Sequence, residues 1–271
     1  PHVMARRQRQ MCIRDRATVG VEIKRQLGSN PDHIILPVGG GGLSAGVTSY
    51  FENECTYTLV EPLGGACLRE ALINGKPTKL DTVNTFADGA AVGKIGEKTF
   101  NRLRNIGLAN VITIPEDRIC ISMLNMLNIE GIVLEPAGAL AVDALQDLGQ
   151  AIKGRRVVCV TSGGNFDFER LPEVKERAQR FAGLKKYLIL RMPQRPGALK
   201  EFLNLLGPDD DITRFEYLKK SARNFGSILI GIETKSPDSF NEFFGQLKEA
   251  GFNYSDTVSY THLRAHETMV D

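Results

Sequence analysis

Four consecutive glycines, Gly39 to Gly42, stand between an apolar run and a segment with helical character. The run 34–38 is typical of a buried strand, and Leu43–Val47 is typical of the start of a helix. Glycines let the backbone approach an anion closely and point successive N–H groups at it. The helix adds the positive end of its dipole. The pattern therefore predicts a phosphate cradle, with a plain flexible turn as the alternative.

The glycine loop lacks the signatures of nucleotide-binding folds. A dinucleotide site needs G-x-G-x-x-G and an acidic residue ~20 residues further on. A nucleotide P-loop needs Gly-Lys-Ser/Thr, which is also missing here. We therefore expect the phosphate to belong to another small cofactor.

A second glycine loop, Thr161–Asn165, follows the apolar run 157–160. Ser162 would stand at the end of that strand, where its hydroxyl could donate to or accept from a ring nitrogen. The same serine could instead form a local turn or cap the next segment. These residues alone leave both interpretations open.

The composition is that of an ordinary folded protein. The 271 residues are 42% hydrophobic and 24% charged, which suits one or two globular domains. A net charge of +2 without a basic stripe gives no reason to expect nucleic acid, and no apolar run approaches the ~20 residues of a membrane helix. The five scattered cysteines fit neither a zinc site nor a disulfide framework. We expect a cytoplasmic protein.

The two ends, residues 1–16 and 258–271, show no hydrophobic period and resemble translated sequencing-adapter stretches. We expect neither to belong to the native fold, and we favour this over a basic nucleic-acid-binding arm. Three of the four histidines lie there, which leaves only His33, at the start of a predicted strand. Histidine chemistry therefore has little support.

Short β-rich runs alternate with helical stretches from Ala17 to about Phe181. This order predicts a parallel sheet with helices on both faces, in which ligands bind beyond the carboxyl ends of the strands. Both glycine loops lie at such ends. The predicted strands are 33–38, 57–61, 111–114 and 157–161, and the predicted helices are 19–27, 43–51, 66–74, 97–106, 116–128 and 137–148.

A second unit follows a charged helical connector at 169–183. Its predicted order is β-α-β-β-α-β, the ferredoxin-like plan. Roughly seventy residues make a small domain, so pairing with another copy is expected. The strands are 187–192, 212–218, 227–233 and 252–254, and the helices are 198–206 and 236–250.

Four motifs occur in a fixed order: Pro37–Leu43, Ala87–Gly89, Leu134–Ala139 and Ser162–Asn165. Together they resemble the serine/threonine dehydratases of the tryptophan-synthase-like class of pyridoxal-phosphate (PLP) enzymes. The segment Arg195–Leu199 resembles the ACT-like regulatory domain of biosynthetic threonine dehydratases. The resemblance covers about residues 17–257. It implies an α/β fold, with the C-terminal part of the catalytic domain at 17–183 and an α+β ACT-like domain at 184–257.

The resemblance also implies a role for each motif. The backbone of Gly39, Gly40, Gly41, Gly42 and Leu43 would hold the cofactor phosphate. Gly89 would lie against the cofactor ring, Glu135 would line the pocket, and Ser162 would face the pyridine nitrogen. A neutral hydroxyl does not keep that nitrogen protonated as a carboxylate would, and we infer that this favours β-elimination over transamination.

The sequence departs from the family at its catalytic base. Members carry a Schiff-base lysine in a Ser-x-Lys-x-Arg-Gly-like segment, and they have an Asn-Gly-Asn-His-like substrate loop. Neither is found here, so we expect an N-terminally truncated chain that is inactive alone and has no catalytic residue. Lys24, Lys94 and Lys98 are poor substitutes because their spacing fits solvated helix faces, whereas a Schiff-base lysine needs a desolvated pocket.

A cation site of related enzymes is only partly matched. Glu61 and Gly65 fit two of its positions, but the third is Cys67. Hard divalent cations prefer oxygen ligands, so we expect no metal here and interpret Cys67 as a small core residue.

The second unit is expected to bind an effector. The resemblance implies isoleucine, contacted by the loop Arg195, Pro196, Gly197 and Ala198, with a helix start that could meet a carboxylate. The alternative is a domain that only holds subunits together in a homo-oligomer, a dimer or a tetramer.

The family resemblance implies a threonine ammonia-lyase of isoleucine biosynthesis. It would convert L-threonine to 2-oxobutanoate and ammonia with PLP as its cofactor. Two alternatives stay open. One is a serine dehydratase or racemase, against which the ACT-like tail argues, and the other is a non-catalytic amino-acid-binding module.

Overall fold

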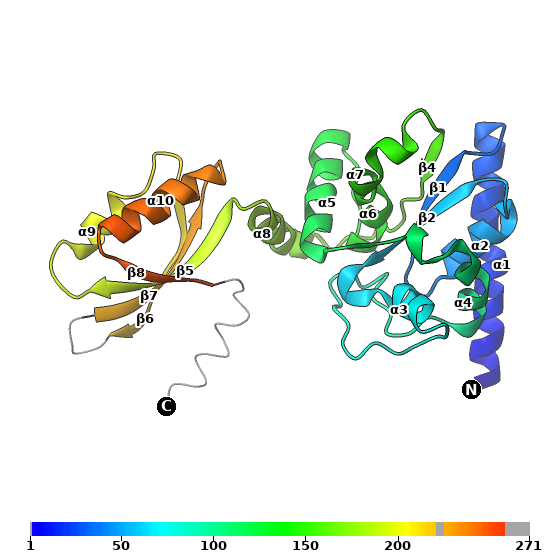
Figure 1. Cartoon of the computed structure of the whole chain (residues 1–271), viewed down its shortest axis with the longest axis horizontal. Coiled ribbons are helices and arrows are strands. Elements are labelled where there is room, and N and C mark those ends of the chain that lie inside the picture. Colours follow the sequence, from blue (N-terminus) through cyan, green and yellow to red (C-terminus); the bar gives the residue numbers. More distant parts are fainter. Residues whose placement is uncertain (1, 221–224, 258–271) are drawn as a thin grey trace. The chain divides into compact units, whose positions relative to one another are not determined.

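The computed structural model describes residues 2–220 and 225–257. The chain divides into two compact units, Pro1–Lys175 and Glu176–Asp271 (Figure 1). The tail expected at 258–271 lies outside the described residues.

The first unit is built on a four-stranded parallel sheet of order β3-β2-β1-β4. The inner strand β1 is buried along its whole length, which explains why its residues after His33 are continuously apolar rather than alternating. All four strands were predicted, and the parallel sheet is confirmed. They are β1 (His33–Pro37), β2 (Thr56–Pro62), β3 (Val111–Ile114) and β4 (Val157–Cys159).

Helices cover the sheet at nearly the predicted positions. The stretch predicted as one helix at 97–106 ends in a 3-10 turn, and the stretch at 137–148 is divided in two. The α-helices are α1 (His2–Leu27), α2 (Gly42–Phe51), α3 (Cys67–Ile73), α4 (Glu97–Leu103), α5 (Glu116–Glu130), α6 (Pro136–Asp143), α7 (Leu145–Leu148) and α8 (Leu171–Phe181), the last spanning the division between the units. The 3-10 turns are η1 (Leu63–Gly65), η2 (Arg104–Ile106), η3 (Leu108–Asn110), η4 (Gly149–Ile152) and η5 (Phe168–Arg170).

Helix α1 is longer than the sequence predicted. We expected a helix from Val19, whereas one unbroken helix runs from His2. That residues 1–16 do not belong to the native fold stays a prediction. Residues 2–16 contain no glycine or proline, so nothing in them stops a helix. Gly46 lets α1 pack tightly on α2, because a Cβ atom there would lie 2.7 Å from the Ile13 carbonyl oxygen.

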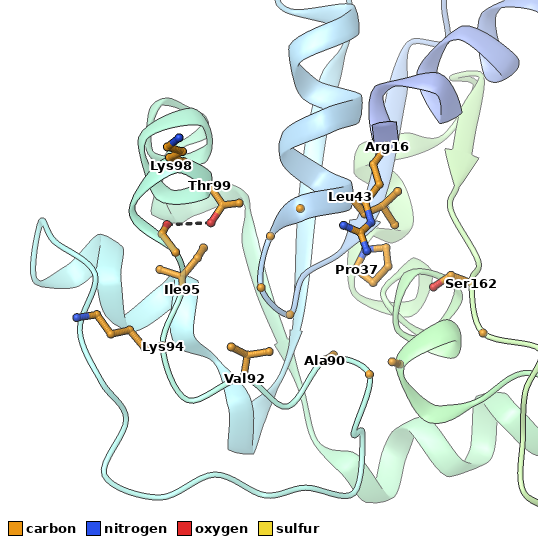
Figure 2. A pocket seen from close by; sticks show the side chains of 18 of the residues that line it. Arg16, Pro37, Leu43, Ala90, Val92, Lys94, Ile95, Lys98, Thr99 and Ser162 are labelled. Carbon is orange, nitrogen blue, oxygen red and sulfur yellow. Dashed lines mark hydrogen bonds between the residues drawn. The ribbon is translucent and has the colours of Figure 1, made fainter. Parts of the chain in front are cut away.

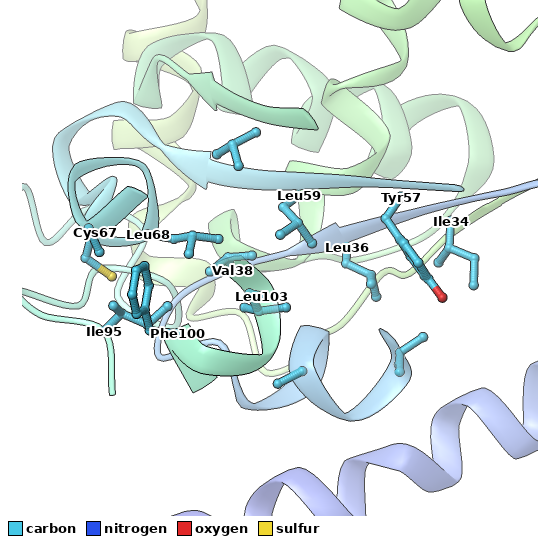
Figure 3. Close-up of a cluster of buried hydrophobic side chains, with 14 of the residues drawn as sticks. Ile34, Leu36, Val38, Tyr57, Leu59, Cys67, Leu68, Ile95, Phe100 and Leu103 are labelled. Atoms are coloured by element: carbon cyan, nitrogen blue, oxygen red, sulfur yellow. The ribbon is translucent and has the colours of Figure 1, made fainter. Parts of the chain in front are cut away.

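One apolar cluster of the first unit joins residues of β1 and β2 with residues of α2, α3 and α4 (Figure 3). It includes Leu36 and Leu59 from the sheet and Phe51 from α2, all fully buried. Val38 and Cys67 also belong to it. The glycine loop follows Val38 and α3 begins at Cys67, so the residues around the loop rest on a packed core.

The second unit is a four-stranded antiparallel sheet of order β6-β7-β5-β8 with two helices. Alternate residues of β5, beginning with Leu188 and Leu190, pack in one core with Phe202 and Phe243 of the helices. This confirms the ferredoxin-like prediction. The elements are β5 (Lys185–Pro193), α9 (Ala198–Leu203), β6 (Asp211–Lys220), β7 (Phe225–Glu233), α10 (Asp238–Glu249) and β8 (Asn253–Thr257). Within the described ranges, no helix is long and apolar enough to cross a bilayer.

Candidate cofactor site

The two glycine loops meet at one edge of the parallel sheet. Strands β1 and β4 are neighbours, so the loops that follow their carboxyl ends lie side by side and border a pocket of about 1190 Å³ (Figure 2). The pocket lining includes all eight residues predicted to bind the cofactor: Gly39, Gly40, Gly41, Gly42, Leu43, Gly89, Glu135 and Ser162. Their contact with a cofactor stays a prediction.

The first loop is closely packed on two sides. A Cβ atom on Gly39 would lie 2.8 Å from the Cα atom of Ala90, and one on Gly41 would lie 3.1 Å from Thr99 Cβ. Gly41 also has a φ of 76°, which L side chains rarely adopt. A Cβ atom on Gly40 would meet nothing within 4 Å. The loop is therefore held against α4 and the 89–90 segment, with Gly40 facing open space.

Gly89 has a steric reason to be glycine in this structure. A Cβ atom there would lie 3.0 Å from both Glu135 Oε1 and Ala137 Cβ. The family resemblance places this position against the cofactor ring, which stays a prediction. The protein's own side chains already crowd it, so this wall stays flat.

Ser162 is placed by contacts between backbones. Helix α6 begins with a proline at its first position, and the Glu135 N–H group directly before it donates to the Gly163 carbonyl oxygen over 2.7 Å. Gly138 lies so close that its Cβ atom would be 1.6 Å from the Ser162 carbonyl oxygen. The sequence order Glu-Pro-Ala-Gly thus fixes the loop that carries the Ser162 hydroxyl.

The surroundings of Glu135 shift its pKa. Burial raises its pKa, and the negative charge of Asp88 raises it further. Asp88 itself accepts a hydrogen bond from the Gly89 N–H group at 2.9 Å. Glu135 therefore holds a proton more readily than an exposed glutamate does.

Three cations border the pocket that sequence reasoning did not place there: Arg16, Lys94 and Lys98 (Figure 2). Both lysines are exposed. Lys98 lies on α4, whose packing on the glycine loop brings it to the pocket edge, whereas Lys94 lies in the loop before α4 and not on a helix face as expected. Arg16 reaches the pocket edge because α1 extends further than predicted. No sequence pattern predicts these positions, because they follow from the packing of distant segments. Lys24 instead pairs with Glu54 at 3.6 Å.

Glu61 and Cys67 belong to no group of three or more metal-binding side chains within the described residues. Glu61 is fully buried. Its two oxygens accept hydrogen bonds from the N–H groups of Leu68 and Arg69, at 2.7 and 2.8 Å, so the carboxylate caps the start of α3. Burial raises its pKa to about 7. Absence of a bound metal stays a prediction.

The predicted effector loop of the second unit is exposed from Arg195 to Gly197, and Ala198 is buried. Gly197 has a φ of 90° and directly precedes α9. The Arg195 guanidinium donates to both oxygens of Glu201 at 2.7 and 2.6 Å. In this structure Arg195 thus has an internal carboxylate partner, which the sequence did not reveal. The role of the loop stays a prediction.

Comparison with protein-family models gives two matches. Residues 9–163 match the model described as pyridoxal-phosphate dependent enzyme. Residues 176–266 match the C-terminal regulatory domain of threonine dehydratase.

Known proteins give a consistent picture. The chain is 44% identical to the biosynthetic L-threonine dehydratase of Halalkalibacterium halodurans over 248 residues, covering 90% of this chain and 60% of that protein. For the corresponding protein of Bacillus subtilis the identity is 44%, covering 88% and 57%. The solved structure of processed threonine deaminase isoform 2 from Solanum lycopersicum aligns with a TM-score of 0.57 and 35% identity, covering 61% of this chain and 49% of that one.

Proposed function

Since the chain belongs to the family of pyridoxal-phosphate dependent enzymes, we propose that its pocket binds pyridoxal 5′-phosphate as part of an L-threonine dehydratase. The observation that carries the proposal is the meeting of both glycine loops, Gly89 and Glu135 in one pocket. The chain spans only 60% and 57% of the two bacterial relatives. The activity of a whole dehydratase is therefore part of the proposal.

The residues of the pocket fit the parts of this cofactor. Gly40 faces open space where a phosphate could approach the backbone, and the N–H groups from Gly39 to Leu43 would donate to it. The flat wall at Gly89 would accept the ring. The Ser162 hydroxyl would hydrogen-bond the ring nitrogen without fixing a proton on it. When bound, the cofactor supplies the electron sink for a carbanion at the amino-acid α-carbon.

The proposed reaction is the conversion of L-threonine to 2-oxobutanoate and ammonia, a step that would serve isoleucine synthesis in the cytoplasm. The match of the second unit to a threonine dehydratase regulatory domain supports threonine over serine as substrate. No Ser-x-Lys-x-Arg-Gly-like segment occurs in the 271 residues. We therefore expect no turnover by this chain alone.

The second unit supports a proposal of feedback regulation by L-isoleucine in a homo-oligomer. Isoleucine would need to bind the less active arrangement of the enzyme more tightly than the active one. The exposed loop 195–197 offers the start of α9 to a carboxylate, although α9 has only 6 residues. The neighbouring Arg195 would have to leave Glu201 to contribute.

The test is a titration of the chain with pyridoxal phosphate, in which the absorbance and fluorescence of the cofactor report binding. We expect saturable binding that inorganic phosphate weakens, and no 2-oxobutanoate from threonine. Gly40→Val should abolish binding with little change in stability, because its side chain would project into open space beside the loop. Gly164→Val is the matched control, since a Cβ atom there also meets nothing within 4 Å.

Each outcome has a separate meaning. Absence of saturable binding by the folded chain would overturn the proposed site. Production of 2-oxobutanoate would show that a lysine within these 271 residues serves as the base, so the expectation of an inactive chain would be wrong.

A further inference from the structure

The glycine loop has little of its own to hold it in shape. Glycines lose more backbone entropy on ordering than any other residue, and the four in this loop have no side chains to anchor it. A loop that is to bind an anion tightly must be ordered beforehand, because the cost of ordering is otherwise subtracted from the binding free energy. The contacts that order this loop must therefore come from outside it.

One such contact joins the two ends of the loop. The Ser44 hydroxyl donates to the Pro37 carbonyl oxygen over 2.7 Å, and Ser44 is fully buried. Pro37 is the last residue of β1, and Ser44 lies in the first turn of α2. This hydrogen bond fixes the start of the helix relative to the strand that precedes the loop.

A second contact holds the loop at its first glycine. The Cys67 thiol donates to the Gly39 carbonyl oxygen, with a sulfur–oxygen distance of 3.5 Å. Cys67 is fully buried and is the first residue of α3. Its position is fixed in turn by Glu61, which accepts hydrogen bonds from the next two N–H groups of that helix. The thiol thus lies on a capped helix, between the Gly39 carbonyl oxygen and the Glu61 carboxyl, with which it also interacts.

We infer that Ser44 and Cys67 are positioning residues, which hold the Gly39–Gly42 backbone in the shape that binds the anion. Neither side chain lines the pocket among the described residues, so both act through the loop. The inference rests on the proposed function, because it assigns the loop to the phosphate of the cofactor. It gives Cys67 a role beyond the filling of core space.

Two pairs of variants test the inference. Cys67→Ala removes the thiol, and Cys120→Ala is its matched control, since Cys120 is also fully buried and donates to a backbone carbonyl, that of Glu116, at 3.4 Å. Ser44→Ala removes the hydroxyl. Ser49→Ala is its control on the same helix, because the buried Ser49 hydroxyl has no hydrogen-bond partner among the described residues.

The first measurement needs no ligand. Hydrogen exchange of the amides from Gly39 to Leu43 should be several-fold faster in Cys67→Ala and Ser44→Ala than in the unchanged chain. The control variants should show no change in this segment. Equal exchange in all five proteins would overturn the inference, whatever the loop binds.

The second measurement separates positioning from general destabilisation. Each test variant should bind inorganic phosphate and pyridoxal phosphate about two- to tenfold more weakly, as expected for the loss of one hydrogen bond. Affinity for pyridoxal, which lacks the phosphate, should not change. Equal loss for pyridoxal and pyridoxal phosphate would overturn the inference. Failure of the unchanged chain to bind phosphate would instead remove the proposed function, and the exchange result would show whether the loop is still held.

Discussion

The Ser162 carbonyl oxygen lies 1.6 Å from the point that a Cβ atom on Gly138 would occupy. The first turn of α6 and the second glycine loop therefore touch through their backbones, with no room for a single methyl group. Glu135 strengthens this contact, because its N–H group donates to the Gly163 carbonyl oxygen. The Ser162 hydroxyl is thus positioned by α6 as much as by the strand that precedes it.

Replacement of Gly138 with alanine should displace the Ser162 loop. The added methyl group would overlap the carbonyl oxygen, so either the loop or α6 must move. We expect pyridoxal phosphate to bind at least about tenfold more weakly and the unfolding free energy to fall by about 1–3 kcal/mol, as for an overpacked core. Binding titrations and urea unfolding measure both. Gly164→Ala, in open space on the same loop, should change neither, and an unaltered Gly138→Ala protein would contradict this packing.

A double-mutant cycle should show that Gly163 and Glu135 are coupled. A Cβ atom on Gly163 would lie 2.1 Å from Glu135 Cδ, and Gly163 has a φ of 76°. Gly163→Ala should destabilise the first unit by both collision and backbone strain. The double variant with Glu135→Ala removes the collision. Its loss of unfolding free energy should therefore be at least about 0.5 kcal/mol smaller than the summed losses of the two single variants. Urea unfolding of the four proteins gives the coupling, and strict additivity would refute it.

Local patterns account for most of what the sequence predicted. The strands and the glycine loops were located because β-rich runs, glycines and helical periods are properties of short segments. The meeting of Gly39–Gly42 with Ser162 followed from one rule of parallel sheets, that ligand sites lie at the strand ends. The order of elements in the second unit was likewise readable. The family resemblance then predicted which part of the cofactor, or which effector, each loop contacts.

The features that sequence reasoning missed depend on packing between segments. Lys98 borders the pocket only because α4 packs on the glycine loop. Glu61 caps α3, and no spacing rule distinguishes this from a metal-binding role. Arg195 pairs with Glu201 six residues further on, across the turn that starts α9. Each of these roles depends on contacts between segments, which local sequence patterns do not encode.

The effector loop should be sensitive to the backbone at Gly197. A Cβ atom there would meet nothing within 4 Å, but the φ of 90° is unfavourable for a β-branched residue. Gly197→Val should therefore destabilise the second unit by about 1–3 kcal/mol and abolish isoleucine binding. Gly197→Asn tolerates positive φ better and should retain most of the stability. Isothermal titration with isoleucine, beside urea unfolding, measures both effects. Full isoleucine binding by a folded Gly197→Val protein would exclude a role for this turn.

The buried carboxyl of Glu61 should make stability depend on pH. Its pKa rises from 4.5 to about 7 on folding, mainly because burial disfavours the charged form. Between these values the folded chain binds a proton that the unfolded chain releases. The contribution of Glu61 is therefore fully present below pH 4.5 and is lost as the pH rises through about 7.

His33 changes stability with pH in the opposite direction. Burial and the charge of Arg155 lower its pKa below the ordinary 6.5, so its contribution to stability rises as the pH rises toward 6.5. Urea unfolding should therefore be compared between the unchanged chain and Glu61→Gln, which removes one titration and leaves His33 in place. The unfolding free energy of the unchanged chain, minus that of Glu61→Gln, should fall by up to about 1.4 kcal/mol for each pH unit between about 5 and 7. Glu97→Gln, exposed in the first turn of α4, should follow the unchanged chain. A constant difference between the unchanged chain and Glu61→Gln over this range would show that the Glu61 pKa is the same in both states.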